Sequence, residues 1–169
     1  AIELNPDSYD AYNLLMGHHI AAGTQQMLPE DQRDVELGLV YGDELIRIRS
    51  DHGYPYHFKA NCYRQKGDFE KAKPLYEKSI EKRKGLSSEG TANLVSGHNY
   101  MFSGDYNNAR DRYIRAINLA RTNNGWFQLN YYLTISHIFE NNYLGAIDNI
   151  NKVEKMMIEK EFDDITRLE

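Results

Sequence analysis

The chain has 169 residues, a formal net charge of −5 and a sequence pI of about 5.7. Because 41% of its residues are hydrophobic and 27% are charged, the composition supports a folded core and excludes a disordered chain. The sequence has no basic block, which excludes nucleic acid as the expected partner.

The first pair of elements in chain order spans about residues 9–50. Tyr12 and His19 lie on one face of an expected first helix, and Val35 and Leu39 lie at helical spacing on a second. Compared with the pair that follows, this one carries seven extra residues between its two helices. The spacing therefore predicts a helical hairpin whose connecting turn is enlarged.

The extra residues fall at about 24–30. Pro29 supports this position, because proline suits the first turn of a helix and not its middle. Upstream of the first pair, residues 1–6 are predicted to be the tail of an earlier second helix. We therefore expect the chain to be a fragment of a longer protein.

The pair at residues 54–84 has the clearest pattern. One face of its first half carries Tyr56, Ala60 and Tyr63. In Gly67-Asp68 the glycine suits a helix C-cap and the aspartate suits the N-cap of the next helix. One face of its second half carries Phe69, Ala72, Tyr76, Ser79 and Ile80. These residues predict two antiparallel helices joined by a tight turn, with small side chains at Ala60 and Ala72 where the helices cross.

The same pattern returns at a spacing of 37 residues. Gly67-Asp68-Phe69 corresponds to Gly104-Asp105-Tyr106 and, more loosely, to Asn141-Asn142-Tyr143. Two further pairs are predicted at about 91–121 and 127–160, with the start of a following helix at 161–169. A fixed period of this size indicates stacked copies of one helical hairpin.

These residues resemble the tetratricopeptide repeat family. The resemblance rests on the ending Ala1–Pro6, on Tyr56-x-x-x-Ala60-x-x-Tyr63 and on the Gly-Asp-aromatic-x-x-Ala turn, and it covers nearly the whole chain. It implies an all-α fold, a right-handed α-solenoid of about four antiparallel helix pairs, in a single repeat domain over residues 1–169. The period exceeds the family's usual one of about 34 residues. In this the chain is similar to the long-helix repeats of bacterial regulators and signalling proteins.

The resemblance also implies that the first helix of each repeat lines a concave groove that holds a peptide or a partner domain. The expected groove residues are Asn13, Gly17, Ile20, Tyr54, His57, Asn61, Arg64, Thr91, Leu94, His98, Met101, Gln128, Tyr131, Ile135 and Ile138. Asn13 and Asn61 are candidates for amide hydrogen bonds to an extended peptide backbone. Leu94, Met101 and the isoleucines of the last repeat are candidates to seat apolar anchors.

An alternative remains for the apolar end of this set. Ile135, Ile138 and Phe139 are equally placed to contact a following helix that contains Phe162 and Ile165. A clamp for a C-terminal carboxylate, which in this family needs several cations on the first helices, is not expected. In this chain only Asn61 and Arg64 come close to that pattern.

The sequence predicts no catalytic site, cofactor or metal centre. His18 and His19 are adjacent and point about 100° apart on a helix, so they are poor joint ligands for one ion. His19 and His137 stand where other repeats have tyrosine, which predicts packed, hydrogen-bonded histidines. Cys62 is the only cysteine, so we expect a packed thiol and a reducing, cytoplasmic location.

The leading functional prediction is a non-catalytic scaffold for protein–protein interaction, without membrane insertion. One alternative is a regulatory or sensor segment of a larger bacterial signalling enzyme or transcription regulator. Another is a receptor for a signal peptide or small ligand. Self-association through the ends of the array also remains open.

Overall fold

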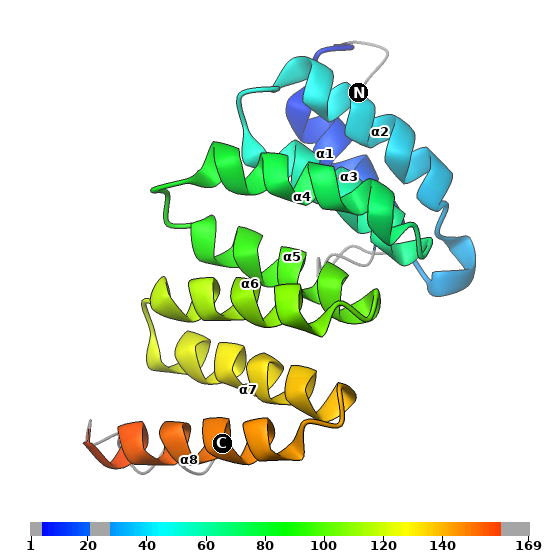
Figure 1. The fold of residues 1–169 in the computed structure, drawn as a ribbon. Helices are drawn as coiled ribbons and strands as arrows, with labels where there is room; N and C mark the ends of the chain where they lie inside the picture. Colours follow the sequence, from blue (N-terminus) through cyan, green and yellow to red (C-terminus); the bar gives the residue numbers. More distant parts are fainter. Residues whose placement is uncertain (1–4, 21–27, 160–169) are drawn as a thin grey trace. The chain divides into compact units, whose positions relative to one another are not determined.

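The computed structural model describes residues 5–20 and 28–159, and within these ranges the chain is helical (Figure 1). In order, the helices are α1 (Tyr9–His19), η1 (Glu30–Gln32, a short 3-10 helix), α2 (Val35–Ile48), α3 (Gly53–Gln65), α4 (Phe69–Arg83), α5 (Glu89–Phe102), α6 (Tyr106–Asn118), α7 (Asn123–Phe139) and α8 (Tyr143–Glu159). The predicted all-α fold, a solenoid of helix pairs, is confirmed. Its right-handed winding stays a prediction.

The helices divide between two compact units, unit 1 up to Ser87 and unit 2 from Ser88. In unit 1, α1 packs on α2, α2 on α3 and α3 on α4, and in unit 2, α5 packs on α6, α6 on α7 and α7 on α8. Figure 1 shows α7 between α6 and α8. Each helical pair is thus stacked on its sequence neighbour within its unit. The single repeat domain over residues 1–169 stays a prediction.

The turns inside three pairs repeat in detail. Gly67, Gly104 and Asn141 have positive φ angles of 76°, 79° and 61°. In each turn the amide of the following residue donates to a carbonyl five residues back, at 2.9, 2.9 and 2.8 Å. This arrangement is a Schellman C-cap, which needs a left-handed residue. Asparagine tolerates that conformation better than most residues, which explains its place in the last turn.

Polar side chains cap the starts of several helices. The side chains of Ser8, Asp34, Asp105 and Thr122 accept backbone amide hydrogen bonds at the starts of α1, α2, α6 and α7. Asp68 was expected to cap α4 in the same way, and this is wrong. Its carboxylate makes no capping hydrogen bond and instead pairs with Lys71 at 3.1 Å, one turn into the helix.

The small residues of the repeat lie where tyrosine rings cross between helices. Ala60 and Ala72 are fully buried, as expected, and so is Tyr76. Gly97 takes the place of Ala60 in the next repeat, and a methyl group there would approach Tyr113 Cε1 to 2.5 Å. Alanine at this position of the third repeat would therefore clash with the Tyr113 ring, and glycine avoids the clash.

The first pair departs from the expected register. Ile20, which was expected in the groove, is 1% exposed and packs in the core cluster with Tyr12 and Met16. α2 begins at Val35, so Pro29 precedes η1 and not the first turn of α2. Pro74, by contrast, is accommodated within a continuous α4.

Some predictions lie outside the described residues. These are most of the tail at 1–6, most of the insertion at 24–30, the last residue of the fourth pair at 127–160, and the following helix at 161–169.

Candidate partner-binding surface

Apart from Ile20, which follows the end of α1, the expected groove residues lie on the first helices of the pairs, and they are divided between the two units. Unit 1 holds Asn13 on α1 and Tyr54, His57, Asn61 and Arg64 on α3. Unit 2 holds Leu94, His98 and Met101 on α5 and Gln128, Tyr131, Ile135 and Ile138 on α7.

The exposure of these side chains separates them into three groups. His57, Asn61 and Met101 are buried. Asn13, Arg64, Leu94, His98 and Ile135 are half-buried, while Tyr54, Gln128, Tyr131 and Ile138 are exposed. The side chains of the exposed group are therefore the ones that are accessible to a partner.

In unit 1 the central polar residues hold the helix pair together. The hydroxyl of Tyr76 on α4 donates to Asn61 Oδ1 at 2.7 Å, and both residues are buried. Burial raises the pKa of Tyr76 to about 12, so it stays a donor. The carbonyl oxygen of Asn61 is therefore engaged inside the repeat, an arrangement that the sequence did not reveal.

His57 is held in the same interior. Its Nδ1 lies 3.2 Å from Arg83 Nη1, and its ring packs beside Tyr76. Burial, followed by the charges of Arg83 and Arg64, lowers the pKa of His57 to about 3. The imidazole of His57 is therefore neutral at physiological pH. The guanidinium of Arg83 also contacts Tyr54, whose ring centre lies 4.3 Å away.

In unit 2 an aromatic cluster connects α5, α6 and α7. His98 Nδ1 lies 2.9 Å from the hydroxyl of Tyr113. The His98 ring meets the edge of Tyr132 with centroids 4.4 Å apart, and Tyr132 stacks near Tyr113 at 6.0 Å. Met101 packs into the same core through its sulfur, 3.5 Å from the Tyr113 hydroxyl. His98 and Met101 therefore pack in the interior of unit 2 and contribute little accessible surface.

One face of α7 remains apolar and exposed beside this cluster. Phe127, Tyr131, Ile135 and Ile138 recur at spacings of four and three, which places them on one side of the helix. Tyr131 is 61% exposed and Ile138 is 41% exposed. The opposite side carries Leu133, which packs into the core with α6. α7 is thus apolar on both sides, and of the outward row Tyr131 and Ile138 are exposed, while Phe127 and Ile135 are half-buried.

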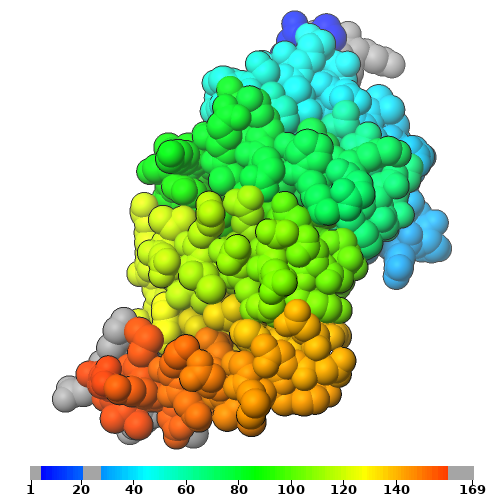
Figure 2. Space-filling model, in the orientation of Figure 1, coloured from blue at the N-terminus to red at the C-terminus, as the bar shows by residue number. Residues whose placement is uncertain are grey.

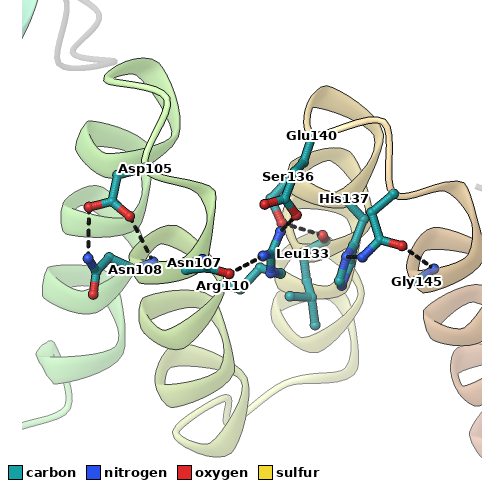
Figure 3. Close-up of polar contacts among 10 residues, drawn as sticks. Asp105, Asn107, Asn108, Arg110, Leu133, Ser136, His137, Glu140 and Gly145 are labelled. Atoms are coloured by element: carbon teal, nitrogen blue, oxygen red, sulfur yellow. Dashed lines mark hydrogen bonds and ion pairs between the residues drawn. The ribbon is translucent and has the colours of Figure 1, made fainter.

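Polar contacts fix which side of α7 faces outward (Figure 3). Arg110 of α6 forms a 2.6 Å ion pair with Glu140 at the end of α7. At the turn into α8, Asn142 pairs with His137 Nδ1 and accepts a 2.9 Å hydrogen bond from the amide of Gly145. The predicted packed, hydrogen-bonded state of His137 is confirmed, as is that of His19, which accepts from the amide of Asp34.

Charge is distributed unevenly between the helices of unit 2. α5 and α7 together contain one carboxylate, Glu89, and neither lysine nor arginine. The second helices α6 and α8 carry Arg110, Asp111, Arg112, Arg115, Asp148, Lys152, Glu154, Lys155 and Glu159. The face formed by the first helices is therefore apolar and uncharged. We call the exposed residues Tyr131 and Ile138, with half-buried Phe127, Leu94 and Ile135, the α5–α7 face.

Sequence reasoning missed several residues that build this surface. Tyr132 connects His98 to Tyr113, and Phe127 extends the apolar row of α7 by one turn. The signal for Phe127 was present, because it lies four residues before Tyr131. Tyr76 and Tyr113 were identified only as core residues, although their hydroxyls orient Asn61 and His98.

The described residues hold no group of three or more His, Cys, Asp or Glu side chains that would suit a metal ion. Cys62 is fully buried, as predicted for a packed thiol, and burial raises its pKa to about 12. None of the described helices is long and apolar enough to cross a lipid bilayer.

Comparisons with known proteins agree with the fold of helix pairs. Residues 54–81 match the family model described as Tetratricopeptide repeat. Among 28 matching chains of solved structures is one titled "MamA RS-1 ArsTM double mutant", with a TM-score of 0.67 and 13% identity. The match covers 96% of this chain and 82% of the other, and at this identity it shows the fold alone. No curated protein matches the sequence.

Proposed function

We propose that this chain, a solenoid of helix pairs with a tetratricopeptide repeat at residues 54–81, is a non-catalytic scaffold that binds another protein through its first helices. The observation that carries the proposal is the α5–α7 face. Its exposed centre is Tyr131, a residue type that often supplies much of the binding energy at protein interfaces.

The chemistry of the face defines the partner. With no lysine or arginine on α5 or α7, the face has no cation with which to clamp a terminal carboxylate. Its side chains instead offer aromatic and aliphatic area around Tyr131. The proposed ligand is therefore an uncharged, apolar segment of a partner protein, lying across α5 and α7 in unit 2.

The residues of unit 1 have a different role in this proposal. Asn61 and His57 face Tyr76 and Arg83 inside the repeat, so they support the groove wall and do not form its contact surface. Exposed Tyr54 remains a contact candidate. The regulatory-segment and small-ligand alternatives stay predictions, and no contact described above favours either of them.

The test compares a contact variant with a matched variant on a second helix. Tyr131→Ser with Ile138→Ser removes the exposed anchors, while Ile114→Ser removes an equally exposed apolar side chain from α6. Partners captured by the wild-type chain would be divided into overlapping peptides and titrated against all three proteins. We expect uncharged apolar peptides to bind, to be lost with the double variant and to be retained by Ile114→Ser.

Salt gives an independent readout of the same proposal. Because the face is uncharged, the dissociation constant should change by no more than about twofold between about 0.05 and 0.5 M salt. Acidic peptides whose binding collapses in salt would contradict the proposal. Equal binding by the wild type and the double variant would contradict it as well.

A further inference from the structure

Two phenylalanines with large exposed fractions lie at the ends of the first helices of unit 2. Phe102 ends α5 and Phe139 ends α7, and each is 59% exposed. Because they are 37 residues apart, they hold the same position in two successive repeats. Figures 1 and 2 show the α5–α6 turn, in light green, and the α7–α8 turn, in orange, on the same side of unit 2. The two residues therefore mark one edge of the unit.

In each of these helices the phenylalanine ends a row of residues spaced by four. The rows are Leu94, His98 and Phe102 on α5, and Phe127, Tyr131, Ile135 and Phe139 on α7. Apart from His98, all of these side chains are aliphatic or aromatic. Residues spaced by four form a ridge on the helix surface, and such ridges pack into the grooves of another helix in the commonest class of helix–helix contact. The two rows are therefore suited to receive a further helix.

The outward side of α7 has few hydrogen-bonding groups to offer a partner. Between Tyr131 and Ile138 the polar residue on this side is Thr134. The Thr134 hydroxyl donates to the carbonyl of Asn130 at 3.0 Å and accepts from Asn149 Nδ2 at 2.9 Å. The hydrogen-bonding capacity of this hydroxyl is thus used inside unit 2.

α5 is similar at its centre. Nδ1 of His98, the middle residue of its row, lies 2.9 Å from the hydroxyl of Tyr113 in the interior. The exposed polar side chains of Thr91 and Gln128 lie toward the starts of α5 and α7. The stretch from Tyr131 to the two phenylalanines is therefore an apolar surface.

This shortage of polar groups determines which backbone conformation the surface accepts. A bound extended segment needs hydrogen-bond partners for its own N–H and C=O groups, and the backbone groups of α5 and α7 are used within the helices. On this surface the backbone of an extended segment would be buried without partners, which is unfavourable. An α-helix satisfies its backbone groups internally and so avoids that cost.

From these observations we infer that the partner segment is an amphipathic α-helix whose apolar side docks on the two rows, with Phe102 and Phe139 as anchors. The inference rests on the proposed scaffold function and specifies its partner. Because α5 and α7 carry neither lysine nor arginine, the docked side of the helix is uncharged and its polar residues face solvent. The row from Phe127 to Phe139 spans about 18 Å, which matches about three turns of a helix with apolar residues at i, i+4, i+7 and i+11.

The test compares two peptide libraries of equal composition and length, each peptide having about 16 residues. One library places Leu, Ile, Met or Phe at helical spacing, and the other alternates the same residues with polar ones, as in a strand. Binders are selected on the 169-residue chain and counter-selected on the variant that combines Tyr131→Ser with Ile138→Ser. We expect binders from the helical library, and circular dichroism should show that they gain helix on binding, since short helices are marginal alone.

The outcomes separate this inference from the proposed function. Binders from the alternating library that are lost with the double variant would overturn the helical partner and leave the proposed function standing. Recovery of no binder from either library would overturn both. In a recovered helical peptide, proline at a central solvent-facing position should weaken binding by about tenfold or more, whereas serine there should not. Equal binding of the proline and serine peptides would also overturn the helical partner.

A second pair of variants tests the anchors. Phe102→Ser with Phe139→Ser removes both phenylalanines, and Ile114→Ser on α6 is the matched control, since Ile114 is also exposed. We expect the dissociation constant of the recovered helical peptide to rise about tenfold or more with the double variant and to stay unchanged with the control. Unchanged thermal unfolding would show that both variants remain folded. An unchanged dissociation constant with Phe102→Ser and Phe139→Ser would overturn the assignment of the anchors.

Discussion

The hydroxyl of Tyr76 donates a buried 2.7 Å hydrogen bond to Oδ1 of Asn61. The bond joins the first and second helices of the repeat at residues 54–81, which is the repeat that matches the family model. The period of 37 residues places Tyr113 and His98 at the same positions, and they form the corresponding 2.9 Å contact. A tyrosine hydroxyl thus orients the central polar residue of the first helix in two successive repeats.

Removing this hydroxyl should destabilise unit 1. Tyr76→Phe leaves the buried Asn61 carbonyl oxygen without its donor, which we expect to cost about 1–3 kcal/mol of unfolding free energy. Urea unfolding followed by circular dichroism measures the change. Tyr143→Phe is the control, because the hydroxyl of this exposed tyrosine bonds at the surface. Equal midpoints for the two variants would show that the buried bond contributes nothing.

Adding a methyl group at Gly97 should destabilise unit 2. The new Cβ would lie 2.5 Å from Tyr113 Cε1, so the ring must shift, at an expected cost of about 1–3 kcal/mol for Gly97→Ala. Gly90→Ala is the matched variant, because its Cβ would meet Leu119 at an ordinary 3.5 Å. There we expect a gain of about 0.5–1 kcal/mol from helix propensity. Thermal unfolding distinguishes the two variants. A stability change of the same sign in Gly97→Ala and Gly90→Ala would refute the steric argument.

The positive φ of the repeated turn should be visible in a substitution series at Gly104. Its φ is 79°, and a Cβ there would touch nothing within 4 Å, so any cost comes from the backbone alone. We expect Gly104→Ala to cost about 1–2 kcal/mol. Gly104→Asn, which copies the residue at Asn141, should cost less. The comparison uses the denaturation midpoints of the two variants, and an alanine variant as stable as the asparagine variant would contradict it.

His57 should make stability depend on pH. Its pKa is lowered from the ordinary 6.5 to about 3 in the folded chain, chiefly by burial. Between these values the unfolded chain binds a proton that the folded chain does not, so the stabilising contribution is complete above about 6.5 and is lost as pH falls toward about 3. Between about pH 6.5 and 5 the expected loss is about 2 kcal/mol. His57→Gln should flatten the dependence of unfolding free energy on pH, and an equal slope in both proteins would refute the assignment.

The turns were predictable because they depend on local chemistry. Glycine or asparagine at 67, 104 and 141 provides the left-handed residue that a Schellman cap requires, and no distant contact is needed. Asp68 shows the limit of this reasoning. Its sequence position suits a cap, yet its carboxylate pairs with Lys71 one turn later and makes no capping hydrogen bond.

The candidate site was less predictable, because helical spacing shows which residues share a face of one helix and does not show which side chains of the adjacent helix contact them. Asn61 and His57 lie on the expected first helix, but whether their polar atoms face solvent depends on the reach of Tyr76 and Arg83 from the next helix. Ile20 was misplaced for another reason. α1 ends at His19 and Ile20 has an extended backbone, so helical spacing does not predict where its side chain points.

The uneven distribution of charge in unit 2 also has a kinetic consequence. Long-range attraction accelerates encounters between oppositely charged surfaces, and the α5–α7 face has almost no charge with which to attract a partner. Its association rate should therefore lie near the unsteered range of about 10⁵–10⁶ M⁻¹s⁻¹. Differences in affinity between competing partners would then arise from residence time. The face would discriminate between partner segments through their dissociation rates and not through their association rates.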